Sequence, residues 1–207
     1  MSAQTNVQVK YNTPLRQAQR DLTRSRIKNA ARNFFYEHHY DATTMDEIAL
    51  AAGLRRSTLY LHYKDKAEIL AEVISDYTPK ARSVLATLPG PGPDLDQVRR
   101  WIGNVAKFVA KERVPLSIIL ELRRNKAHTA ALETLTGQLL AGMGEHNPRF
   151  REAARSDADP VLRARGLLLL QQLTYACEVY LDNKNDARGK ALLAVTAEDF
   201  TIFLSKN

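Results

Sequence analysis

The stretch AGLRRSTLYLHYKDKAEIL, residues 52–70, carries the side chains best suited to contact a polyanion. Arg55 and Arg56 are adjacent, and the hydroxyl groups of Ser57 and Thr58 follow them. An arginine can bond guanine at two acceptor atoms, and short hydroxyl side chains can bond base edges or phosphates. This pattern predicts recognition of duplex DNA.

The second half of the stretch adds contacts to the phosphate backbone. Tyr60 and His62 can donate hydrogen bonds to phosphate oxygens, and Lys66 brings a positive charge to the start of the next helix. We expect Leu59 to point inward against Ile48. The segment would then be apolar on one side and basic on the other.

Two short helices would position these side chains. Thr44 and Glu47 have the spacing of a capping box, which begins a helix, and Gly53 ends that helix. A second short helix is expected from about Arg55 to Leu61. Such a pair is a helix-turn-helix, whose second helix fits the major groove of B-DNA.

Longer helices flank this pair on both sides. An apolar stripe at helical spacing predicts a preceding helix, with Thr23 as its cap and the members Ile27, Ala30, Ala31, Phe34 and Phe35. Asp65 and Glu68 begin a following helix to roughly Thr87. Residues 88–94, LPGPGPD, then break the helical pattern.

Charge agrees with a polyanionic partner. The 207 residues carry a net charge of +7, and residues 1–66 hold eleven Lys and Arg against six Asp and Glu. Nucleic acid is the commonest partner of such a segment, although a basic segment can also be merely well solvated. The single cysteine, Cys177, permits no intrachain disulfide and fits a reducing compartment. With no secretory signal and no membrane span, we expect a cytoplasmic protein.

Catalytic and metal-binding patterns are absent from the sequence. The five histidines show no metal-site spacing with Cys, Asp or Glu, and no nucleophile elbow, phosphate loop or dinucleotide fingerprint occurs. We therefore expect no enzyme activity, no metal and no cofactor.

The stretch TTMDEIALAAGLRRSTLYLHYKDKAEIL closely resembles the DNA-binding domain of TetR-type transcriptional regulators, and the resemblance covers about residues 22–72. Arg55 departs from the family, which usually has a serine there. Losing that cap should cost about 0.5–2 kcal/mol, which phosphate contact could offset; Arg55 can also be a plain surface residue. The DNA-binding residues that we predict are Thr43, Thr44, Arg55, Arg56, Ser57, Thr58, Tyr60, His62, Tyr63 and Lys66.

The whole chain is expected to be all-α, with about nine helices and no sheet. We divide it into an N-terminal arm (1–21), a helix-turn-helix domain (22–66), a connecting helix (67–87) and a C-terminal domain (88–207). The arm is expected to be partly disordered, with residues 1–12 a tail. Lys10, Arg16 and Arg20 could alternatively track a groove or the DNA backbone.

The resemblance implies that residues 88–207 bind an effector and form a homodimer. The apolar helices 161–181 and 187–204 are expected to form a four-helix bundle with their symmetry mates, unless they lie deep inside one subunit. The pocket candidates, which could equally be plain core, are Trp101, Phe108, Glu121, Leu122, Arg123, His128, Met143, Tyr175 and Glu178. An inward arginine would suit an aromatic or acyl acid.

The expected mechanism is repression at a palindromic operator, with release by the small molecule. The alternative is a DNA-binding regulator or activator that has no small-molecule effector.

Overall fold

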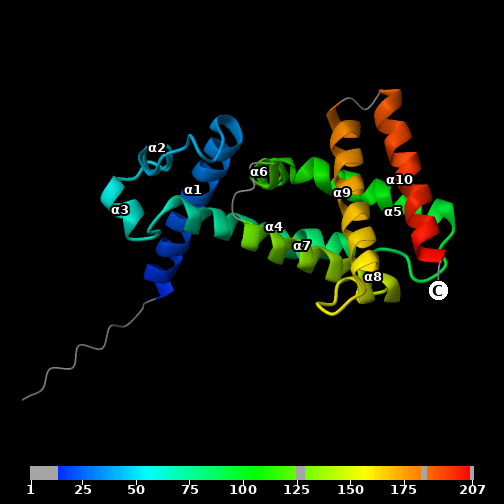
Figure 1. Ribbon diagram of the computed structural model, residues 1–207. Coiled ribbons are helices and arrows are strands. Elements are labelled where there is room, and N and C mark those ends of the chain that lie inside the picture. The colour runs from blue at the N-terminus through cyan, green and yellow to red at the C-terminus, as the bar shows by residue number, and fades with distance from the viewer. Residues whose placement is uncertain (1–13, 125–128, 183–185, 206–207) are drawn as a thin grey trace, which may run out of the picture. The chain divides into compact units, whose positions relative to one another are not determined.

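The computed structural model describes residues 14–124, 129–182 and 186–205. Every regular element in these ranges is a helix, as predicted from the absence of strand alternation (Figure 1). The chain divides into two compact units, residues 1–69 and 70–207. The helices are α1 (Pro14–His38), α2 (Met45–Ala51), α3 (Arg56–Tyr60), α4 (Lys66–Leu85), α5 (Leu95–Lys111), α6 (Arg113–Arg124), α7 (Thr129–Met143), α8 (Pro148–Ala153), α9 (Pro160–Asp182) and α10 (Ala187–Ser205).

The first unit is built around α1. The side chains of Ile27, Ala31 and Phe35 are fully buried, which confirms the predicted apolar stripe. Two residues from the helix pair join this core, Ile48 of α2 and Leu59 of α3, and both have no exposed surface. Leu59 is therefore the inward anchor of α3, as expected.

Helix α1 begins earlier than the sequence pattern indicated. It starts at Pro14, and the hydroxyl of Thr23 donates to the carbonyl of Gln19 at 2.9 Å instead of capping a helix start. Residues 14–21, expected as part of an arm, are helical turns of α1, because no residue after Pro14 interrupts the helix. Residues 1–13, including Lys10, lie outside the described part of the chain.

The second unit contains the rest of α4 and helices α5 to α10. Helices α9 and α10 lie side by side, and α5 packs against both (Figure 1). Aromatic rings from three helices fill this core. The ring centres of Trp101 and Phe200 are 5.2 Å apart, and those of Phe150 and Phe203 are 4.8 Å apart. The short helix α8, which supplies Phe150, was not predicted and brings the described helices to ten.

Candidate nucleic-acid interface

The turn between α2 and α3 depends on Gly53. Its φ of 64° lies in the left-handed region, which only glycine adopts without strain. A guanidinium holds the turn from outside: Nη2 of Arg26 donates to the carbonyl of Ala52 at 2.6 Å. A Cβ at Gly53 would lie 2.8 Å from that same Nη2. The backbone angle therefore favours glycine here, and any other residue would also have to displace the end of the Arg26 side chain.

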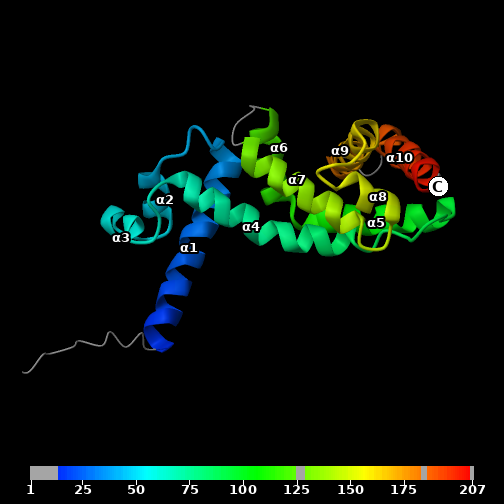
Figure 2. The same cartoon turned by 60° about the horizontal axis from the view of Figure 1, so that its bottom comes forward.

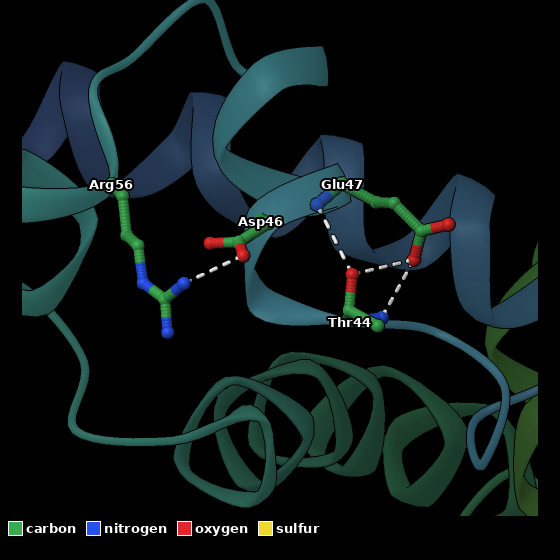
Figure 3. A network of polar contacts seen from close by, with 4 residues as sticks. All are labelled: Thr44, Asp46, Glu47 and Arg56. Atoms are coloured by element: carbon green, nitrogen blue, oxygen red, sulfur yellow. Dashed lines mark hydrogen bonds and ion pairs between the residues drawn. The ribbon is translucent and has the colours of Figure 1, made fainter.

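The start of α2 carries the predicted capping box (Figure 3). The amide of Glu47 donates to Oγ1 of Thr44 at 3.3 Å, and the amide of Thr44 donates to the Glu47 carboxylate at 2.8 Å. The hydroxyl of Thr44 also donates to that carboxylate, at 2.7 Å. These hydrogen bonds from the Thr44 hydroxyl and amide lower the pKa of Glu47.

Helix α3 has no side-chain cap. Arg55 occupies the cap position in an extended conformation and makes no capping hydrogen bond, as its departure from serine predicted. Its side chain is exposed, together with those of Arg56 and Ser57, and Thr58 is half-buried. The N-terminal end of α3 therefore presents its basic and hydroxyl groups to solvent.

Arg56 is already paired in the free protein. Its Nη1 lies 2.7 Å from Oδ2 of Asp46 (Figure 3), and its guanidinium carbon lies 5.5 Å from the centre of the Tyr60 ring. Both partners of the ion pair are well exposed, and such pairs contribute at most about 1 kcal/mol. A phosphate or a guanine can therefore displace Asp46 at low cost, while the pair orients Arg56 beforehand.

Three of the ten predicted contact residues have structural roles. Thr43 is only 2% exposed and its hydroxyl donates to the carbonyl of His39 at 2.8 Å, while Tyr63 is 1% exposed under the guanidinium of Arg24. Nζ of Lys66 donates to the carbonyls of Tyr40, Asp41 and Thr43 at 2.7, 3.0 and 3.0 Å. The sequence could not show this, because the three carbonyls lie more than twenty residues before Lys66.

His62 lies half-buried just after α3. Within the described part of the chain, its Nδ1 is buried and has no hydrogen-bond partner. Burial lowers the pKa of His62, and the nearby charges of Arg20 and Arg24 lower it further. The imidazole is therefore neutral at pH 7, where it can donate from one nitrogen to a phosphate but brings no charge.

Comparisons with known proteins agree with this geometry. The model of the tetR family of bacterial regulatory proteins matches residues 27–73. An uncharacterized HTH-type transcriptional regulator of Mycobacterium tuberculosis is 26% identical over 173 residues, which cover 82% of this chain and 88% of that protein. The chain belongs to the TetR family.

Two further relatives illustrate how the TetR-family similarity is distributed. The HTH-type transcriptional regulator AcrR of Shigella flexneri is 37% identical, but over only 51 residues, or 25% of this chain and 24% of AcrR. A complex of SmeT with triclosan shares the fold, with a TM-score of 0.62 and 19% identity over 86% of this chain and 90% of that one. SmeT is the repressor of the Stenotrophomonas maltophilia multidrug efflux pump SmeDEF.

The family assignment settles the class of activity. This TetR-family chain is a DNA-binding transcriptional regulator and not an enzyme. Across the described residues, none of the helices combines the length and the apolar character needed to cross a bilayer.

The second unit of this TetR-family chain contains a small apolar cavity. Its volume is about 50 Å³, and its walls come from α4, α5, α6, α7 and α9. The lining residues are Tyr77, Ala81, Val84, Leu85, Val105, Phe108, Val109, Leu116, Ile119, Leu120, Arg123, Leu135, Leu139, Leu170, Leu173 and Thr174. Among the predicted pocket residues that the structure describes, Phe108 and Arg123 line it and the others do not.

The other predicted pocket residues lie elsewhere. Trp101, Leu122 and Met143 are buried in the core and are not among the residues that line this cavity. Tyr175 is exposed and its hydroxyl accepts from Arg188, while Glu121 and Glu178 are half-buried and outside the lining. His128 lies outside the described residues.

Arg123 brings a positive charge to the cavity wall. Nη2 donates to the hydroxyl of Thr136 at 3.0 Å, and no carboxylate in the described ranges pairs with the guanidinium. Burial lowers the pKa of Arg123. A half-buried cation beside an apolar wall is poorly solvated, so an anionic group brought by a ligand would find strong pairing there.

Proposed function

We propose that the chain is a ligand-responsive repressor that acts as a homodimer on a palindromic operator in the cytoplasm. The observation that carries the proposal is that one chain contains both an exposed basic helix, α3 in the first unit, and an apolar cavity with a cation in its wall in the second unit. The fold neighbour SmeT is a repressor and has been captured with triclosan, which supports the same general scheme.

The reading surface in this proposal consists of the exposed part of the predicted set. Arg55 and Arg56 would reach base edges from the N-terminal end of α3, with Ser57 and Thr58 beside them. Tyr60, which is 43% exposed, and neutral His62 would donate to phosphates, as would Thr44 at the start of α2.

The dimer surface that we propose lies on α9 and α10. Val161, Leu168 and Tyr175 are exposed on α9 at seven-residue spacing, and Val195 and Ile202 are exposed on α10 at the same spacing. Such heptad spacing places the side chains in one stripe along each helix. Two copies that met through these stripes would form the four-helix bundle expected from the sequence, with α3 helices one DNA turn apart, about 34–36 Å.

The effector that fits the cavity best is a small apolar acid. The wall is apolar apart from groups such as Arg123, Tyr77 and Thr174, and Arg123 would take the carboxylate in a bidentate pair. A cavity of about 50 Å³ is smaller than the roughly 150 Å³ that accommodates benzene. An effector would therefore have to push the wall outward.

This expansion supplies a route to release. Tyr77, Ala81, Val84 and Leu85 on the wall belong to α4, whose first turn is part of the DNA-binding unit. A ligand that fits only the expanded cavity favours a displaced α4, and with it a dimer that no longer matches the operator. A complete reversal requires a preference of about 5.5 kcal/mol for the displaced state.

The experiment that tests the proposal begins with operator selection. Purified protein would select duplexes from random DNA at stated salt, and sedimentation would report the stoichiometry. We expect a palindromic site bound by two chains, and weaker specific binding by Arg56→Ala and Tyr60→Ala. Unchanged binding by both variants would contradict the assignment of α3 as the reading helix.

The effector is tested on the selected operator. A series of aromatic and acyl carboxylates, each with its neutral methyl ester, would be titrated while DNA release and heat are measured. Arg123→Gln should lose the preference for the acid over the ester, whereas the matched variant Arg124→Gln, at an exposed neighbour, should keep it. Absence of binding by every acid would favour the alternative, a regulator without an effector, which the small cavity also fits.

A further inference from the structure

The first turns of α1 form a basic extension of the DNA-binding unit. They run beyond α2 and α3 within that unit (Figure 2). Between Pro14 and Arg26 the helix holds four arginines and one aspartate. This composition differs sharply from the apolar stripe that the same helix carries further on.

The arginines continue the face that is buried later in the helix. Steps of three or four residues back from Ile27 reach Arg24, Arg20 and Arg16, which share one side of an α-helix with it. Ile27 is fully buried, Arg24 is half-buried, and Arg20 and Arg16 are exposed. The face that packs against the core in the second half of α1 is thus a line of cations in the first half.

Arg24 ties this line to the end of the reading helix. Its Nη1 donates to the carbonyl of His62 at 3.1 Å, and its guanidinium carbon lies 4.4 Å from the centre of the Tyr63 ring. The charge of Arg20 is also close enough to His62 to act on its ionisation. The arginine face therefore adjoins the C-terminal end of α3.

Arg16 and Arg20 are not neutralised by any side chain that the structure describes. Across residues 14–124, 129–182 and 186–205, neither has a hydrogen-bonded or ion-paired carboxylate, and the nearby Asp21 accepts from Gln17 at 2.9 Å. Like charges one helical turn apart repel each other. An anion bound across them would relieve this repulsion.

We propose that Arg16, Arg20 and Arg24 form an additional DNA-contact surface, the α1 arginine face, which binds the sugar-phosphate backbone beside the groove that α3 occupies. The proposal rests on the proposed function, because it extends the same interface. A line of guanidinium groups at helical spacing matches regularly spaced phosphates and reads no base. Arg24 positions the line, and Arg16 and Arg20 make the contacts.

The test compares two variants that remove equal charge. Arg16→Gln/Arg20→Gln removes the two exposed cations, and Arg100→Gln/Lys107→Gln removes two exposed cations of α5. Gln preserves helix propensity, and circular dichroism would check helicity. Affinity for a random-sequence duplex of about three helical turns would be measured over a range of salt concentrations.

We expect the affinity of the α1 variant at 0.1 M salt to fall about ten-fold or more. The slope of log K against log salt concentration should become shallower by about 1.8 for each subunit that makes the contact. Arg16→Lys/Arg20→Lys should restore most of the affinity, because lysine also binds phosphate as a point charge. An α1 variant with the affinity and salt slope of the α5 control would overturn this proposal alone. If the wild-type chain did not bind DNA at all, the proposed function itself would be overturned.

Discussion

The proposed reading surface of the first unit and the cavity of the second unit differ in how closely they already fit the ligands that we propose for them. The reading surface is exposed and held in place by polar contacts: Gly53 and Arg26 set the turn, and Asp46 orients Arg56. The cavity is apolar, encloses about 50 Å³ and holds a half-buried Arg123 without a carboxylate partner in the described ranges. The proposed reading surface is therefore preformed, whereas the cavity would have to expand before it could hold the proposed effector.

Loss of the Lys66 ammonium should break the preformed surface most severely. Lys66→Met leaves the carbonyls of Tyr40, Asp41 and Thr43 without their donor. Hydrogen bonds to a charged group contribute about 1.5–3 kcal/mol, so we expect the first unit to lose about 2–4 kcal/mol. Chemical denaturation and hydrogen exchange of α1–α3 amides would measure this loss.

Lys64→Met is the control for Lys66→Met, because Lys64 is exposed and two residues away. It should change stability by less than about 0.5 kcal/mol. Equal effects of the two variants would show that the charge alone, and not the contact with three carbonyls, matters for the first unit.

Two glycine variants, one in each unit, should change stability in opposite directions. Gly53→Ala forces a left-handed residue and places Cβ 2.8 Å from Arg26, so we expect a loss of about 1–2 kcal/mol together with weaker DNA binding. Gly103 lies inside α5 with open space around its Cβ position, so Gly103→Ala should stabilise by about 0.5–1 kcal/mol. Thermal unfolding checks both, and a stabilising Gly53→Ala would contradict the turn geometry.

A smaller loss than that of Gly53→Ala is expected at two capping boxes, that of Thr44 in the first unit and that of Asp94 in the second. Thr44→Ala and Asp94→Ala each remove a cap and should each cost about 1 kcal/mol, but only Thr44→Ala should weaken DNA binding. Unfolding and DNA affinity measured on both variants would check this. Equal loss of DNA affinity in the two variants would contradict the assignment of DNA binding to the first unit.

The contribution of the Thr44–Glu47 capping box to stability depends on pH. The pKa of Glu47 lies below its ordinary value of 4.5 in the folded chain, because Thr44 donates two hydrogen bonds to its carboxylate. The stability that this provides is complete above the ordinary value and is lost as the pH falls through the lowered pKa. Unfolding measured from pH 6 downward should therefore bring wild-type and Glu47→Gln proteins together at acid pH.

Local signals in the sequence were enough to predict the helix pair. The capping box at Thr44 and Glu47, the left-handed Gly53 and the uncapped Arg55 each depend on residues within a few positions, so the pattern alone predicts them. The buried anchor Leu59 follows from helical periodicity in the same way. The earlier start of α1 was missed because its first turns carry arginines where an apolar stripe was sought.

The all-helical class and the segment that presents basic side chains therefore follow from local patterns in the amino-acid sequence. The folded structure determines which cations remain available, because Lys66 and Arg26 donate to acceptors more than twenty residues away. Arg16 and Arg20, by contrast, find no carboxylate partner in the described ranges. The folded structure likewise determines that Tyr77 and Arg123 line the cavity and Trp101 does not. Helical periodicity indicates which side chains are buried, but the long-range packing of α4 to α9 determines which residues they are buried against.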